Sequence, residues 1–196
     1  MSEKYLQWYE IPEKRWRNDP ESGYRSFRDS QRQKLYNAES CARGKMQILK
    51  LNPSFPSIEE IQKFVNKLIS STWFIKRFGD NVVCKVIHAK PNQQNAYAKF
   101  LHISLPCWAW NKIVVLHELI HIITKGYEGA HGRFFARALL ELTEHILGHE
   151  ARVILKKEYK RYNVKHTPKK QLTDEDRKAR RERFIKNVLK KEKINV

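Results

Sequence analysis

The chain has 196 residues, of which 41% are hydrophobic and 11% aromatic, a composition that favours one globular domain with a sizeable core and excludes a disordered chain. Its longest apolar runs are shorter than the roughly 20 residues that a membrane span needs, and its polar, aromatic start is unlike a secretory signal peptide. The formal net charge of +18 indicates an acidic partner, most often nucleic acid, or else a solvated basic surface.

The first predicted elements are a helix and a short strand. Residues 26–40 have the apolar spacing of a helix, with Phe27, Leu35 and Tyr36 on one side. Residues 45–52, with the sequence KMQILKLN, alternate loosely between apolar and polar side chains. Such alternation is typical of a strand.

A second helix and two strands are predicted next. Ser57 with Glu60 forms the capping-box signature of a helix start. Residues 81–89 and 97–106 are rich in β-forming side chains and are separated by the polar sequence KPNQQNA, so they predict a hairpin or two adjacent strands. The helix that begins at Ser57 carries apolar residues at helical spacing and should pack one face on the core: Ile58, Ile61, Phe64, Val65, Leu68 and Ile69.

The rest of the chain has a helical pattern. Three helices are predicted over residues 110–125, 131–148 and 150–162. A linker over 164–171 then leads to a last basic helix that opens at Thr173. This order of elements predicts an α+β fold with a helical C-terminal half.

The helix predicted over residues 110–125 carries a chemical motif. His117 and His121 are four residues apart, so they lie one turn apart on the same face, where both imidazoles can reach one metal ion. Glu118 projects at a different angle and can accept a proton from a metal-bound water without being a ligand. This is the HExxH pattern of zinc peptidases. The alternative is a pair of core histidines beside a surface glutamate, which the apolar residues around the motif disfavour.

A zinc site needs a third protein ligand. His131 is the best candidate, because the glycines of KGYEGAHG permit a reversal that returns the chain to the metal. Glu141 and Glu144 on the next helix are the alternatives, as in zinc sites with two histidines and one glutamate. His102 and Tyr127 are weaker candidates for stabilising an oxyanion. The remaining histidines are more typical of surface or structural positions: His88, His145, His149 and His166.

The motif residues carry a resemblance. LHELIH followed by AHGRFF resembles the arrangement in SprT-like metalloproteases, where a histidine–glycine pair after HExxH opens the next helix. Over roughly residues 26–163 the chain also resembles an uncharacterised family of metallohydrolases from bacteria and their phages. That resemblance rests on FRDSQRQKLYNAE, SIEEIQKFVNKLISSTWF, ISLPCWAWNKIVVLHELIH and GAHGRFFARALLELTEHILGHEA. It implies a zincin-like fold, in which a small sheet packs on the HExxH helix, with His117, His121 and His131 as Zn²⁺ ligands and Glu118 as general base.

The function implied by the resemblance is that of a zinc metallopeptidase, which hydrolyses peptide bonds of a protein or peptide substrate with a Glu-activated, zinc-bound water. We expect the strand within 99–106, which leads into the motif helix, to lie at the sheet edge beside the cleft, where an extended peptide can pair with its backbone. Two other classes stay open. They are a basic nucleic-acid-associated protein and a phage structural or packaged protein, each with a zincin fold whose zinc is structural. The intact Glu118 disfavours both, because a closed zinc site does not need it.

The extent of the resemblance divides the chain into three predicted parts. Residues 1–25 form an N-terminal extension, 26–163 the metallohydrolase domain, and 164–196 a basic tail with 12 Lys and Arg against 5 Asp and Glu. The tail is a candidate nucleic-acid site, since such a segment can order on a polyanion.

The cysteines bear on the compartment. Cys41, Cys84 and Cys107 are odd in number, widely spaced and without a CxxC pair, which is typical of free thiols in a reducing compartment. We therefore expect a protein with no membrane partner in the bacterial cytoplasm, or in the phage particle if the chain is phage-encoded.

Overall fold

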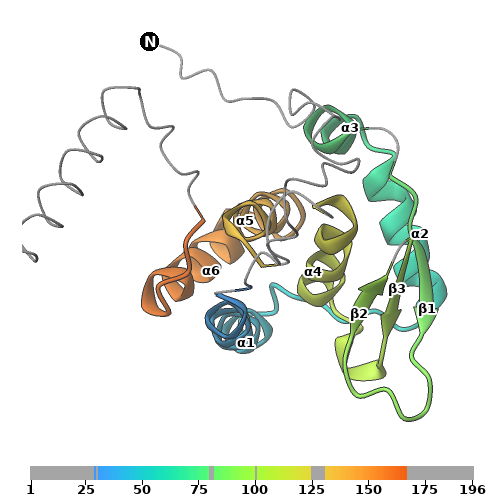
Figure 1. The fold of residues 1–196 in the computed structure, drawn as a ribbon, viewed down its shortest axis with the longest axis horizontal. Coiled ribbons are helices and arrows are strands. Elements are labelled where there is room, and N and C mark those ends of the chain that lie inside the picture. The colour runs from blue at the N-terminus through green and yellow to red at the C-terminus, as the bar shows by residue number, and fades with distance from the viewer. Residues whose placement is uncertain (1–28, 30, 80–81, 100, 125–130, 167–196) are drawn as a thin grey trace, which may run out of the picture.

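The described residues form an α+β fold. The structure, a computed structural model, describes residues 29, 31–79, 82–99, 101–124 and 131–166 (Figure 1). In chain order the elements are α1 (Arg32–Ile48), α2 (Ile58–Ile69), α3 (Thr72–Phe78), β1 (Lys85–His88), β2 (Tyr97–Lys99), β3 (His102–Leu105), the 3₁₀ turn η3 (Cys107–Ala109), α4 (Lys112–Ile123), α5 (Arg133–Leu147) and α6 (His149–Arg161).

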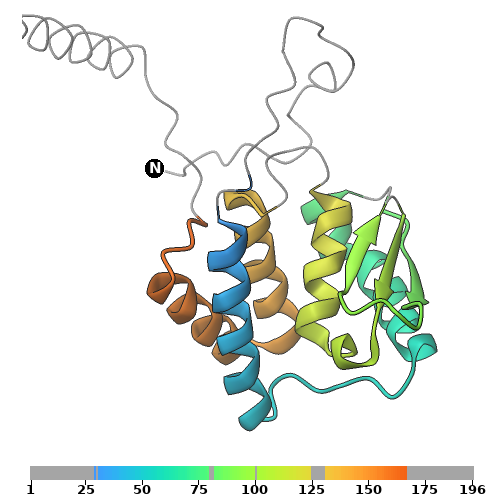
Figure 2. The same ribbon diagram turned by 60° about the horizontal axis from the view of Figure 1, so that its bottom comes forward.

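Helix α4, which carries the HExxH motif, lies between a helical layer and the sheet (Figures 1 and 2). On the helical side, α1 packs along α6, and α5 packs on both α6 and α4. On the other side, α4 contacts β2 and β3, while α2 packs on β1. This position agrees with the apolar sequence of α4, since a helix that is hydrophobic nearly all round has to be buried.

The sheet has the strand order β1-β3-β2. β1 pairs in parallel with β3 and places Val86 opposite Ile103, whereas β2 pairs with β3 in antiparallel fashion and places Ala98 opposite Ile103. The prediction that the strand before the motif helix lies at the sheet edge is therefore wrong. β3 is central because consecutive residues Ile103–Leu105 are buried on both faces, and β2, with its mostly exposed residues, is the edge strand beside α4.

Two further strand predictions need correction. Residues 45–52 do not form a strand, because Met46 continues the buried stripe of α1 and the helix runs on to Ile48. The chain reverses just afterwards at Lys50, which has φ 55°. Residues 97–106 form two strands, because the chain turns at Leu101 and pairs β2 with β3 as a hairpin. Of the two arrangements predicted for the runs 81–89 and 97–106, adjacent strands are confirmed and a hairpin is not, because β1 pairs with β3 in parallel.

The helices predicted from Ser57 and over 110–125, 131–148 and 150–162 are confirmed to within a few residues at their ends, whereas the helix predicted over 26–40 is α1, which begins at Arg32 and continues to Ile48. Ser57 caps α2, since its hydroxyl accepts a hydrogen bond from the Glu60 N–H at 3.3 Å. Asn111 caps α4 by accepting from the Val114 N–H. Gly148 ends α5 with φ 88°, a left-handed conformation that favours glycine. Helix α3 was not predicted as a separate element.

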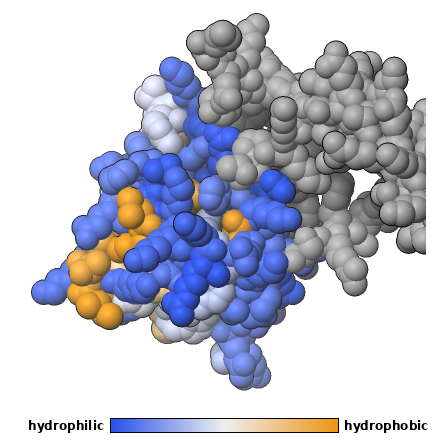
Figure 3. All heavy atoms as spheres, turned by 90° about the vertical axis from the view of Figure 1, so that its left-hand side faces the viewer, coloured by the Kyte–Doolittle hydropathy of each residue, from blue (hydrophilic) through white to orange (hydrophobic). Residues whose placement is uncertain are grey.

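One face of the described part is mostly polar. Figure 3 faces the side of the molecule at which α6 lies and shows mainly hydrophilic residues, with an apolar area toward one edge. Within the described ranges, no helix combines the length and the apolar composition that crossing a membrane requires. Cys41, Cys84 and Cys107 are all free thiols, as the sequence predicted.

Several predictions concern segments outside the described residues. These are the N-terminal extension over 1–25, the side chain of Tyr127, and the basic tail beyond residue 166 with its helix from Thr173. At the start of the predicted tail, Val164 is buried and the backbone N–H of Lys165 donates to the side chain of Gln31.

Candidate metal centre

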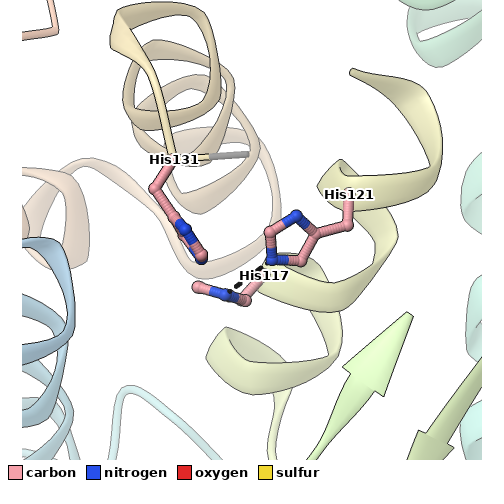
Figure 4. A group of neighbouring side chains, drawn as sticks. All are labelled: His117, His121 and His131. Atoms are coloured by element: carbon pink, nitrogen blue, oxygen red, sulfur yellow. Dashed lines mark hydrogen bonds between the residues drawn. The ribbon is translucent and has the colours of Figure 1, made fainter. Parts of the chain in front are cut away.

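Three imidazoles meet between α4 and the start of α5 (Figure 4). His117 and His121 project from consecutive turns of α4, and His131 lies two residues before α5. One ring nitrogen of each histidine lies within 4.8 Å of the others, and the Nε2 atoms of His117 and His121 are 3.2 Å apart. The structure thus brings together the three histidines that the sequence singled out as ligands.

The separation of His117 and His121 suits two ligands of one tetrahedral metal ion. Zn²⁺ with Zn–N distances of roughly 2.0–2.1 Å holds its nitrogens about 3.3 Å apart, close to the separation of His117 and His121. The Nε2 atom of His131 is buried and has no hydrogen-bond partner among the described residues. An unpaired buried nitrogen is costly, so a metal ligand role accounts for an atom that the protein leaves unsatisfied.

Two carboxylates, one in α1 and one just before it, contact the imidazoles. Glu39 Oε2 lies 2.7 Å from His117 Nδ1, and Asp29 Oδ2 lies 2.6 Å from His131 Nδ1. A carboxylate at Nδ1 keeps the proton on that nitrogen and leaves the lone pair of Nε2 for a metal. The HExxH spacing gave no sign of Asp29 or Glu39, since they precede their histidines by 102 and 78 residues.

The electrostatics of the cluster differ from one histidine to the next. Burial lowers the pKa of His117, but the carboxylates of Glu39 and Glu118 more than offset this, so its pKa is raised. Burial, together with the neighbouring imidazoles of His117 and His131, lowers the pKa of His121 to about 2. Burial also lowers the pKa of His131, against the opposing effect of Asp29. His121 is the imidazole of the cluster without a carboxylate partner among the described residues. It is therefore held most strongly in the neutral form, which is the form that binds a metal ion.

Glu118 lines an open cleft beside the three histidines. The cleft has a volume of about 920 Å³ and runs between α1 on one side and the segment 95–99, which includes β2, on the other. Burial raises the pKa of the Glu118 carboxyl to about 7, with His117 lowering it and Glu39 raising it further. A carboxyl of this kind can both accept and donate a proton near neutral pH.

Aromatic rings pack around the cluster. Phe135 of α5 contacts all three imidazoles, with ring centroids 4.6–5.1 Å apart. Tyr36 of α1 lies 5.6 Å from His117 and 5.0 Å from His131, measured between ring centroids, and it also lines the cleft. The sequence predicts only that Tyr36 lies on the apolar side of a helix. It gives no indication of the contacts of Tyr36 with the histidines.

The alternative third ligands are engaged elsewhere. Glu141 forms ion pairs with Arg77 at 2.7 Å and with Arg137 at 2.9 Å. Glu144 pairs with His149 and Arg152, each at 3.1 Å. Both carboxylates therefore already have cationic partners.

Three other histidines named from the sequence make contacts that support the fold. His102 is not among the residues that line the cleft, and its ring lies 6.2 Å from that of Tyr97. His145 stacks on Trp73 with ring centroids 3.9 Å apart, and Nδ1 of His88 bonds the backbone oxygen of Ala89 at 2.7 Å.

Comparison of the chain with protein-family models, with curated proteins and with solved structures finds no match. Function is therefore inferred from the geometry of this cluster and of its cleft.

Proposed function

We propose that the chain is a zinc-dependent metallopeptidase with a zincin-like arrangement of sheet and motif helix. The observation that carries the proposal is the position of Glu118, which lies next in sequence to one of three converging imidazoles and lines the open cleft beside them. His117, His121 and His131 would hold the ion.

The chemistry follows from the residues around that position. Zn²⁺ held by three imidazoles supplies Lewis acidity, which polarises a substrate carbonyl and makes water a nucleophile near neutral pH. Glu118 accepts the proton of the attacking water and returns it to the leaving amine. We assign stabilisation of the carbonyl oxygen to Tyr36, because its ring packs against two of the three imidazoles and it lines the cleft.

An extended peptide suits the shape of the cleft. Within the described sheet β2 has a neighbour on one side, so its other edge offers backbone groups to a substrate strand. The five residues 95–99 that line the cleft span about 16 Å when extended. A substrate segment of about five residues would therefore fill it.

The competing hypothesis is a zinc ion with a purely structural role, in a nucleic-acid-associated or phage structural protein. A structural site is closed by four protein ligands. In the described residues the cluster holds three, and the cleft reaches it. This observation favours a catalytic site.

The direct test compares peptide hydrolysis by the zinc-loaded chain, the chelator-treated chain and zinc-loaded Glu118→Gln, with a mixed peptide library as substrate and mass spectrometry as readout. We expect Glu118→Gln to retain zinc and lose at least roughly 10²-fold in rate, because glutamine cannot act as a base. Equal cleavage by the wild type and Glu118→Gln would contradict the proposal.

A further inference from the structure

Two arginines line the cleft on the same face of α1. Arg32 and Arg43 both belong to the cleft wall and lie 11 residues apart in the sequence. At a rise of 1.5 Å per residue they are about 16 Å apart along the helix. Tyr36 and Glu39, which contact the candidate ligands, lie between them. Along α1, Arg32 and Arg43 thus flank the two helix residues that contact the candidate ligands.

These arginines differ from four others in the described part of the chain. Arg77, Arg137, Arg152 and Arg161 each have a glutamate within 2.7–3.7 Å. Neither Arg32 nor Arg43 has a carboxylate within ion-pair distance among the described residues; each guanidinium instead faces an aromatic ring, that of Tyr36 at 5.5 Å and that of Trp108 at 5.3 Å.

Trp108 orients the guanidinium group of Arg43. It comes from η3, on the far side of the cleft from α1, and its indole N–H donates to the backbone oxygen of Gln94 at 2.8 Å, which fixes the ring. A guanidinium over an aromatic face keeps the N–H donors of its edge for a carboxylate. The contact is therefore compatible with binding an acidic group and preorganises the arginine for it.

We propose that the cleft selects peptides with acidic side chains on both sides of the scissile bond, one bound by Arg43 and one by Arg32. This inference rests on the proposed peptidase function. The spacing of the arginines corresponds to about five residues of extended chain, so the two acidic side chains should lie four or five residues apart.

A peptide fits this charge pattern better than a nucleic acid does. Arg32 and Arg43 line the cleft on either side of Glu39 along α1, and Lys99 and Glu118 line it as well. A peptide can place carboxylates at the two arginines and a neutral backbone over the glutamates. A nucleic acid carries a charge on every nucleotide and would bring phosphates against those carboxylates.

Binding can be measured without turnover on full-length, zinc-loaded Glu118→Gln. The probes are fluorescent peptides of about eight residues with two Glu five positions apart, and the same peptides with two Gln or two Lys. By fluorescence anisotropy we expect the Glu peptide to bind about tenfold more tightly than the Gln peptide. Adding Arg43→Gln should remove most of this difference. Lys34→Gln, the same charge change on α1 outside the cleft lining, should preserve it and so correct for the basic charge of the whole chain.

The possible outcomes separate this inference from the proposed function. Equal binding of the Glu and Gln peptides, or a preference that survives Arg43→Gln, would overturn the acidic selection even if the wild type cleaves peptides. An Arg43-dependent preference for Glu peptides with no cleavage by the zinc-loaded wild type would leave the binding site standing and remove the peptidase proposal. Displacement of the Glu peptide by single-stranded DNA that itself requires Arg43 and binds more tightly would assign the cleft to nucleic acid.

Discussion

Helices α4 and α1 contribute to the same centre in different ways. The three motif residues of α4 lie within five consecutive positions, and the geometry of one helix turn brings them together. The groups that α1 and the residues before it supply are Asp29, Tyr36 and Glu39, which reach the histidines only through packing of α1 against the rest of the helical layer. In the proposed site, α4 supplies two of the three metal ligands and the general base, whereas Asp29 and α1 orient imidazoles and line the cleft.

Removing a ligand should have the largest effect. We expect His117→Ala, His121→Ala and His131→Ala each to lose bound zinc, measured by elemental analysis. Free zinc at about 100 times its dissociation constant should raise the free energy of unfolding of the wild type by about 3 kcal/mol and leave these variants unchanged. His149→Ala, at an exposed position, is the control and should keep both zinc and the response. Full zinc content in His131→Ala would reopen the question of the third ligand.

The next largest effect concerns the cleft wall on α1. Tyr36→Phe removes one hydroxyl and keeps the ring that packs on His117 and His131. If the hydroxyl stabilises the developing negative charge, kcat should fall by about 10²-fold with little change in KM. Zinc content should stay at the wild-type level. An unchanged kcat would limit Tyr36 to packing.

The carboxylates behind the ligands should have smaller effects, on affinity. We expect Glu39→Ala and Asp29→Ala each to weaken zinc binding by about 10- to 100-fold, measured by competition with a chromophoric chelator. Glu39→Gln should recover part of the loss, because its amide oxygen still accepts the Nδ1 proton of His117. A general loss of stability would not distinguish Gln from Ala in this way, so equal losses in the two variants would contradict an orienting role.

The smallest effect should come from the contact that fixes α1 on α6. Lys45 Nζ lies 2.5 Å from the buried carboxylate of Glu158, which Arg161 also approaches at 3.7 Å. Lys45→Ala should cost about 1–2 kcal/mol in free energy of unfolding, because Lys45 is half exposed and Arg161 remains. Zinc affinity should change by less than about threefold, well below the effect of Glu39→Ala. A larger change in affinity would mean that the position of α1 itself is easily disturbed.

The sequence predicted the local part of this architecture well. Helices α2, α4, α5 and α6 followed from apolar spacing and capping residues, and the convergence of His117 and His121 followed from one helix turn. The strands were harder to predict, because the edge or central place of β3 depends on which strands pair with it and not on its own residues.

The supporting residues could not be found from periodicity. Leu35 and Met46 mark the core side of α1, but nothing in that pattern shows that Glu39 faces an imidazole 78 residues away. The roles proposed for Tyr36 and Arg43 likewise depend on the cleft, which α1 forms together with residues far away in the sequence. These contacts depend on packing between segments far apart in the sequence, so they can be identified only from the three-dimensional structure.

X-ray absorption at the zinc edge of the purified, zinc-loaded chain tests the central claim most directly. Three imidazole ligands with one further light ligand, at roughly 2.0–2.1 Å and without sulfur, would agree with a site built from His117, His121 and His131 and left open toward the cleft. Four protein ligands, a thiolate, or fewer than three imidazoles would contradict it.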